Sequence, residues 1–289
     1  MYTKPITALK NARGRIDYTL MNDYMFHRVM QECEKGLKGF ICSLLHLNPE
    51  SMQCVTMLNP IALGEKITDK FVILDVKVLL NNAMIINLEI QVEKQNFWDD
   101  RSVVYLARIF NNIDKGDPYY SVKPSYHVGI LNFTLFPDYP EFYATNKLLN
   151  VKKHYIYNDK FTMNVLDLTQ IALATDEDKQ WQIDDWARLF KAGTWEELYM
   201  LAQKNDVFEE TCETILKLNQ DDVAREWCEM REEGLRIERT WQHIHEKDLE
   251  ALAKLRAEKD AELAKLQAEK DAELAKLQAE LQQLKRTQK

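Results

Sequence analysis

The segment FVILDVKVLLNNAMIINLEIQV, residues 71–92, contains two apolar strands joined by a short polar turn. Asn81 and Asn82 predict a β-hairpin, because asparagine tolerates the left-handed backbone that tight turns require. Each strand carries one acid, Asp75 in the first and Glu89 in the second. A carboxylate within an apolar strand is costly to desolvate unless a cation, a donor or water meets it. The sequence therefore predicts two acids side by side on a sheet, an arrangement suited to a divalent metal.

An amide extends this predicted group of acids. Side chains alternate between the two faces of a strand, so Glu89 and Gln91 are expected on one face and Ile90 on the other. Carboxylate and amide oxygens are hard ligands that suit Mg²⁺ or Mn²⁺. A simpler interpretation stays open, in which Asp75 ends an exposed strand and Glu89 lies on a polar face.

These residues resemble the active site of the PD-(D/E)XK nuclease superfamily. Within it they resemble the transposase-like recombination-promoting nuclease family, whose active-site strand ends in Glu-x-Gln. Asp75 matches the first metal-binding acid and Glu89 the second, Gln91 stands where most of the superfamily has lysine, and Leu74 replaces proline. The resemblance covers about residues 17–235. Its other matching segments are Asn22–Arg28, Arg101 with Tyr105, Gly116–Tyr119, Lys123–Pro124, residues 218–222 and Arg231–Glu233.

The resemblance implies an α/β fold with a restriction-endonuclease-like core, a mixed central sheet flanked by helices. It implies a metal-dependent DNA endonuclease that acts in recombination, on mobile elements or in defence against foreign DNA. Asp75 and Glu89 would hold Mg²⁺ or Mn²⁺, and Gln91 would orient the water or the phosphate. Gln91 lacks the charge of a lysine and offers only neutral hydrogen bonds. The alternative is a non-catalytic nuclease-fold scaffold that binds partners through its C-terminal coiled coil.

Residues 98–112 show apolar side chains at helical spacing, which predicts a helix packed on the sheet. Arg101, Tyr105 and Arg108 are spaced i, i+4 and i+7 and should form one stripe close to Glu89. Such a stripe could bind DNA phosphates that flank the site. The alternative is that Arg101 pairs with a local acid and that Tyr105 belongs to the core.

Asp23 is a further acid near the predicted first helix, where nucleases of the superfamily often place a supporting carboxylate. Asn22 or Asp23 directly precedes an apolar run, which is typical of an N-cap residue. The capping interpretation is favoured, and Asp23 is left outside the predicted site.

Composition fits a globular chain of this class. With 289 residues and 46% apolar content, the chain can bury a substantial core. The net charge of −8 is uneven, because residues 1–160 hold 19 basic against 17 acidic residues and the remainder is acidic. The nuclease-like half is thus close to neutral, and its local basic cluster is Lys147, Lys152 and Lys153.

The five cysteines form no C-x-x-C pair, so neither a disulfide framework nor a structural zinc is predicted. The N-terminus lacks the apolar core of a signal peptide, and no apolar run approaches the length of a membrane span. We expect a cytoplasmic, reduced protein with DNA as its partner and no membrane association.

The sequence predicts four regions along the chain. Residues 1–16 form an N-terminal extension, and residues 17–170 form the nuclease-like domain, with further strands at 126–133 and after 155. Residues 171–240 carry an amphipathic pattern with breaks at Gly193 and Asn205, which predicts a helical subdomain.

Residues 241–289 form the fourth region, a long helix with an 11-residue repeat, since 260–270 recurs as 271–281. This period keeps like residues aligned along a helix with little or right-handed supercoil. We expect a coiled coil that joins copies of the chain, with a solvated single helix as the alternative. The stripe consists of Leu252, Leu255, Leu263, Leu266, Leu274, Leu277, Leu281 and Leu284.

Overall fold

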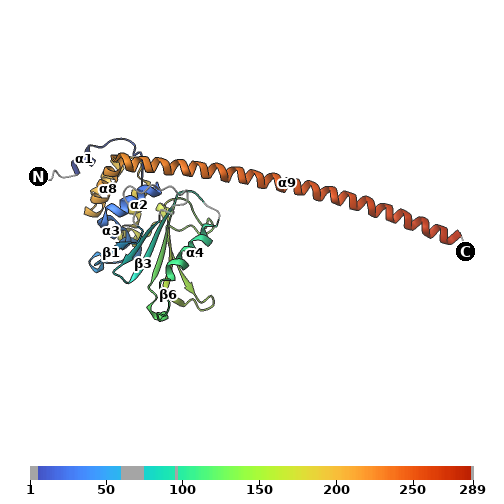
Figure 1. Ribbon diagram of the computed structural model, residues 1–289, viewed down its shortest axis with the longest axis horizontal. Helices are drawn as coiled ribbons and strands as arrows, with labels where there is room; N and C mark the ends of the chain where they lie inside the picture. Colours follow the sequence, from blue (N-terminus) through green and yellow to red (C-terminus); the bar gives the residue numbers. More distant parts are fainter. Residues whose placement is uncertain (1–5, 60–74, 95–96, 288–289) are drawn as a thin grey trace. The chain divides into compact units, whose positions relative to one another are not determined.

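The computed structural model describes residues 6–59, 75–94 and 97–287 (Figure 1). It divides into two compact units, residues 1–232 and residues 233–289. The first unit contains the sheet and most helices, and the second consists of the greater part of one long helix.

The first unit is built on a six-stranded mixed sheet with the order β1-β2-β3-β4-β6-β5. Strands β3, β4 and β6 are parallel neighbours, whereas the pairs β1/β2, β2/β3 and β5/β6 are antiparallel. This arrangement confirms the predicted mixed sheet. The strand bounds are β1 Val55–Met57, β2 Val76–Leu80, β3 Met84–Gln91, β4 Ser125–Leu131, β5 Tyr143–Leu149 and β6 Ile156–Asp167.

The hairpin between β2 and β3 turns at the two predicted asparagines. Asn81 and Asn82 have φ values of 49° and 55°, in the left-handed region that asparagine tolerates. The side-chain oxygen of Asn81 also accepts hydrogen bonds from the backbone N–H groups of Gln53 and Cys54, at 2.9 and 3.0 Å. The turn therefore also holds the segment that enters β1. The predicted beginning of the first strand, residues 71–74, lies outside the described residues.

Helices cover both faces of the sheet (Figure 1). Helix α4 packs on one face, and the other shares a single hydrophobic core with α2, α3 and the helices that follow β6. The core joins strand residues such as Leu88 and Val128 to helix residues such as Phe40, Trp186 and Phe208. The helix bounds are α1 Ile6–Asn11, α2 Asp23–Glu32, α3 Glu34–Leu45, α4 Trp98–Phe110, α5 Asp176–Gln180, α6 Ile183–Lys191, α7 Trp195–Ala202, α8 Asp206–Asn219 and α9 Asp222–Thr287, with short 3-10 turns at η1 Pro49–Ser51, η2 Tyr119–Ser121 and η3 Ile171–Leu173.

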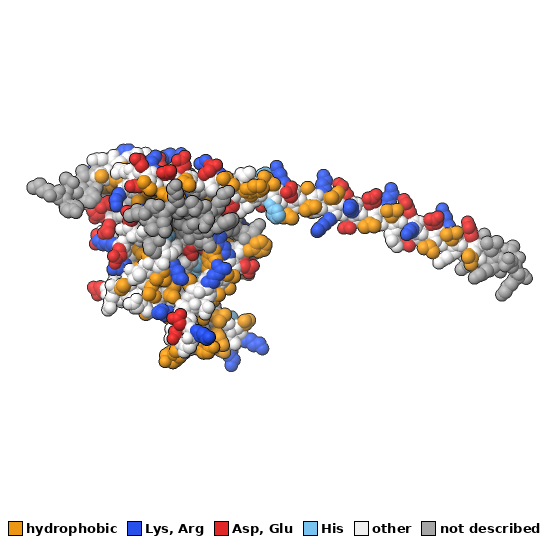
Figure 2. Space-filling view, viewed as in Figure 1, with side chains coloured by type: hydrophobic (Ala, Val, Ile, Leu, Met, Phe, Trp, Pro, Cys, Tyr) orange, Lys and Arg blue, Asp and Glu red, His pale blue; other side chains and the backbone are white. Residues whose placement is uncertain are grey.

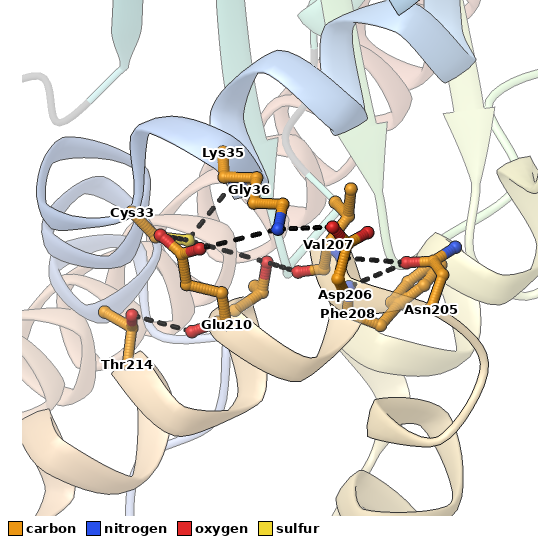
Figure 3. Close-up of polar contacts among 10 residues, drawn as sticks. Cys33, Lys35, Gly36, Asn205, Asp206, Val207, Phe208, Glu210 and Thr214 are labelled. Atoms are coloured by element: carbon orange, nitrogen blue, oxygen red, sulfur yellow. Dashed lines mark hydrogen bonds and ion pairs between the residues drawn. The ribbon is translucent and has the colours of Figure 1, made fainter. Parts of the chain in front are cut away.

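The contact between α3 and α8 shows how tightly the late helices join this core (Figure 3). Gly36 lies so close to α8 that a Cβ atom there would be 2.4 Å from Thr211 Oγ1. At the rim, Lys35 forms an ion pair with Asp206 at 2.5 Å. Asn205 caps α8 by accepting two backbone N–H bonds, as the predicted break at this position requires.

Helix α4 meets the sheet at two points. At its N-terminal end Trp98, only 1% exposed, lies against Gly129 of β4. Toward its C-terminal end Leu106 and Ile109 pack on Ile85 of β3. The helix therefore runs along the strands. Its beginning is fixed over Gly129, the β4 residue that pairs with Glu89.

The second unit is a helix whose predicted leucine stripe faces solvent. Each described leucine of the stripe, from Leu252 to Leu281, is more than half exposed. The coiled coil remains a prediction. Within the described part of the chain, no helix combines the length and the apolar character needed to cross a membrane.

Gly129→Ala should destabilise the first unit. The added Cβ would lie 2.2 Å from the Trp98 ring, and forcing apart such a packed contact costs about 1–3 kcal/mol. Gly193→Ala is the matched control, because a Cβ there meets no atom within 4 Å. Urea unfolding should separate the two variants, and equal midpoints would contradict the close Trp98 contact.

His27 should make stability fall as the pH drops below 6.5. Its ring is 1% exposed with Nε2 3.0 Å from the Asn59 carbonyl, and burial lowers its pKa to about 4. Between pH 6.5 and about 4, His27 binds a proton in the unfolded chain but not in the folded chain. The free energy of unfolding therefore falls by up to about 1.4 kcal/mol for each unit by which the pH drops. Unfolding of His27→Gln between pH 7 and 5 should show a smaller slope, whereas the exposed-tail control His243→Gln should match the parent.

Candidate functional site

The two predicted acids lie opposite each other on neighbouring strands. Val76 of β2 pairs with Leu88 of β3, so the next residues along the ladder, Asp75 and Glu89, are placed in line. Asp75 is partly buried and Glu89 is 3% exposed. The structure thus brings together the pair that the hairpin predicted.

Burial shifts the titration of both acids. Desolvation raises the pKa of Asp75, and a hydrogen bond with Asn87 opposes this effect. Desolvation raises the pKa of Glu89 to about 7, which Arg101 opposes and the nearby charge of Asp75 reinforces. Each carboxylate is therefore costly to ionise in the absence of a positive charge.

Positive charge reaches Glu89 from helix α4. Arg101 Nη2 lies 2.6 Å from Glu89 Oε1, with the Arg101 side chain 30% exposed. This ion pair differs from the alternative considered for the sequence, in which Arg101 pairs with a local acid on its own helix. The Arg101 charge therefore opposes the desolvation of the buried Glu89 carboxylate.

His127 of β4 completes the surroundings of Glu89 and was missed by the sequence analysis. Its Nε2 lies 3.5 Å from Glu89 Oε2, and its Nδ1 lies 3.2 Å from Asn87 Nδ2. An amide nitrogen can only donate, so Nδ1 accepts and Nε2 carries the proton that faces Glu89. Burial lowers the pKa of His127 to about 4, with Arg101 adding to the effect, so the ring is neutral at pH 7. The available signal was a polar residue within the apolar run 126–133.

Gln91 lies two residues beyond Glu89 on the same face of β3, as the alternation predicted. It is partly buried, and its Nε2 donates to the carbonyl of Glu93 at 3.1 Å. This contact holds the amide at the C-terminal end of β3.

The stripe on α4 has the predicted residues on one side. The guanidinium carbons of Arg101 and Arg108 lie 5.2 and 5.5 Å from the centre of the Tyr105 ring. The edge of this ring meets His127, with ring centres 6.1 Å apart. Tyr105 therefore lies between two cations, the partly exposed Arg101 at Glu89 and the exposed Arg108.

Asp23 belongs elsewhere. The α2 cap is Asn22, whose side-chain oxygen accepts from the Met25 N–H at 3.1 Å. Asp23 pairs with Arg231 at 2.6 Å, a contact that attaches the beginning of α9 to α2.

The donor set fits a hard divalent cation with few protein ligands. Among the described residues, no three His, Cys, Asp or Glu side chains gather as a metal site. Mg²⁺ commonly binds through one or two carboxylates, with water and substrate phosphate as the remaining ligands. Asp75 and Glu89 supply such a pair, and neither Glu89 oxygen accepts a well-aligned hydrogen bond from the described residues. A cation would offset the desolvation, and the smaller repulsion from Asp75, that raise the Glu89 pKa.

Comparison with known families gives an independent result. The family described as PD-(D/E)XK nuclease family transposase matches residues 20–245, which include β2, β3, α4 and the helices after β6. No curated protein and no solved structure matches the chain. The matched region covers more than half of the sequence and contains both acids and the α4 stripe. The chain belongs to the PD-(D/E)XK nuclease family transposases.

Proposed function

We propose that this protein is a metal-dependent endonuclease that hydrolyses phosphodiester bonds in DNA. The supporting observation is the placement of Asp75 and Glu89 in line on β2 and β3, in surroundings that raise the pKa of both. Two adjacent carboxylates with raised pKa values, one buried and one partly buried, are typical of a functional site.

Each residue has a defined task in this proposal. Asp75 and Glu89 hold Mg²⁺ or Mn²⁺, which when bound lowers the pKa of a water and stabilises charge on the phosphate. Gln91 orients the water or a phosphate oxygen by hydrogen bonding. His127 lies with its Nε2 3.5 Å from Glu89 Oε2, and its neutral ring forms one wall of the site beside that carboxylate.

The α4 stripe provides contacts to the DNA backbone. Arg101 lies close to the acids, while Arg108 is exposed on the same side of the helix. Phosphate contacts of this kind position a duplex without reading its sequence. The proposal includes a cytoplasmic role in recombination, mobile elements or defence against foreign DNA, and association of copies through the C-terminal helix.

A non-catalytic nuclease-fold scaffold is the second candidate. Two contacts favour it, because Arg101 already occupies Glu89 Oε1 and the Gln91 amide already donates to the Glu93 carbonyl. In a scaffold these contacts persist, whereas in an enzyme they exchange when metal and substrate bind. Metal binding measured separately from cleavage distinguishes the two candidates.

Asp75→Asn and Glu89→Gln should each abolish metal-dependent cleavage of supercoiled plasmid. Losing one carboxylate ligand should slow the reaction at least about 10³-fold, equivalent to roughly 4 kcal/mol of barrier. Nicking by the parent should require Mg²⁺ or Mn²⁺ and stop in EDTA. Asp138→Asn and Glu141→Gln, at exposed positions outside the proposed site, are the matched controls.

The same variants should lose stabilisation by metal. A cation that binds the folded chain raises its melting temperature by mass action. The parent and the controls should show this rise with Mn²⁺, and the two site variants should not. A parent that neither cleaves nor gains stability with any metal would leave the scaffold as the better description.

Removal of the tail should dissociate the oligomer. A chain ending at Ile244 lacks every leucine of the exposed stripe, so the apolar contact between copies is lost. Light scattering should give a multiple of the monomer mass for the full chain and the monomer mass for the truncated one. Leu263→Glu/Leu274→Glu should act like the truncation, whereas the opposite-face control Lys265→Glu/Lys276→Glu should not. An unchanged mass after truncation would exclude the tail as the site of association.

A further inference from the structure

The β5–β6 hairpin carries an unusual exposed surface at the edge of the sheet. Its tip, defined here as residues 147–157, contains exposed lysines at 147, 152 and 153. Exposed apolar and aromatic side chains are interspersed with them. Val151 is 89% exposed, Tyr157 75% and Tyr155 54%.

The η2 turn extends this surface. Tyr119 and Tyr120 are 89% and 83% exposed. Lys160 of β6 joins the turn to the hairpin, because its Nζ donates to the carbonyls of Tyr120 and Val122 at 3.0 and 2.9 Å. Figure 1 shows the hairpin and the adjoining turn at one end of the sheet, and Figure 2 shows blue and orange side chains gathered at that end.

Local hydrogen bonds fix the backbone conformation of the tip. Asn150 Oδ1 accepts hydrogen bonds from the backbone N–H groups of Lys152 and Lys153 at 3.1 and 2.9 Å. The Asn150 N–H donates to the Tyr155 carbonyl at 2.9 Å, which closes the turn. The backbone polar groups are thus satisfied locally, and the lysine and tyrosine side chains remain available to a partner.

The charge of this surface contrasts with the rest of the chain. Residues 143–160 contain four lysines and one acid, within a chain whose net charge is −8. Interfaces between proteins are depleted in lysine, whereas lysines interspersed with aromatic rings are typical of nucleic-acid contacts. Charge complementarity therefore favours a polyanion over a second protein.

The geometry links this surface to the acids. Glu89 pairs with Gly129, and Gly129 pairs with Val165 of β6. Tyr157 precedes Val165 by eight residues, so the tip is about 26 Å along the strand from the row of Glu89. Arg108, near the C-terminal end of α4, lies between the acids and the tip. Helix α4 begins over Gly129, and near its other end Ser125 Oγ donates to the Ile109 carbonyl at 3.2 Å.

We propose that the hairpin tip and η2 form a second contact for duplex DNA, at least about eight base pairs from the phosphate at the proposed Asp75 and Glu89 metal site. The spacing follows from a rise of about 3.4 Å per base pair. Lys152 and Lys153 contact phosphates, and the exposed tyrosines donate hydrogen bonds to the same backbone. The inference rests on the proposed endonuclease function, which it extends by assigning a place where flanking duplex is held.

The test measures DNA binding by the full chain without cleavage. Fluorescence anisotropy with a 30-base-pair duplex in EDTA compares the parent with Lys152→Ala/Lys153→Ala across a range of salt concentrations. Loss of two phosphate contacts should weaken binding about tenfold or more and lower the salt slope by about 2. The matched control is Lys10→Ala/Lys179→Ala, two exposed lysines on α1 and α5, which should bind like the parent. Tyr155→Ala/Tyr157→Ala should weaken binding with a smaller change in slope.

The outcomes separate this inference from the proposed function. Tip variants that bind less tightly support the second contact, even if the parent never cleaves plasmid. Tip variants that bind like the parent overturn the second contact, even if Asp75→Asn abolishes cleavage. A parent that binds no duplex also overturns it. If the tip variant instead changes the mass measured by light scattering and leaves DNA binding intact, the tip is an interface between copies.

Discussion

The burial of the Glu89 carboxylate is the constraint on which the site depends. At 3% exposure, the Glu89 carboxylate lies 2.6 Å from a guanidinium nitrogen of α4 and 3.5 Å from an imidazole nitrogen of β4, so three elements meet at one point. Removing Arg101 would leave the buried carboxylate without its charged partner, which is far costlier than losing a surface pair. The positions of α4 and β4 are therefore coupled to the ionisation of a single side chain.

Close packing makes this meeting possible. Gly129, opposite Glu89 on β4, leaves room for the Trp98 ring, and the start of α4 settles directly on the sheet. Arg101 then follows Trp98 by three residues, about one helical turn, which brings its side chain to the carboxylate. A bulkier residue at 129 would lift this turn and separate Arg101 from Glu89. Backbone proximity at one glycine thus determines an electrostatic contact on the neighbouring strand.

Local pattern predicted the hairpin, the α4 stripe and the helix breaks near Gly193 and Asn205, because turn chemistry and periodicity act over a few residues. The mixed sheet was expected from the family resemblance. Local pattern did not identify His127 as part of the site. That residue joins Glu89 only through the parallel pairing of β3 with β4, and the pairing spans a crossover of more than thirty residues. The sequence left the partner of Arg101 undecided for the same reason, because acids on its own helix lie nearer to it along the chain. Contacts that depend on tertiary register leave little trace in local spacing.

The neutral Gln91 is understandable from the charges around it. Most of the superfamily resembled here has lysine at this position, and a lysine would add a second cation beside Arg101. Here α4 supplies the positive charge from across the sheet, with Arg101 2.6 Å from Glu89 and Arg108 further along the same helix. Two cations close together would repel each other and weaken the hold on the carboxylate. A strand amide together with a helix guanidinium gives one donor that is neutral and one that is charged, and in the proposed mechanism the neutral one would turn toward a water while the ion pair stays in place.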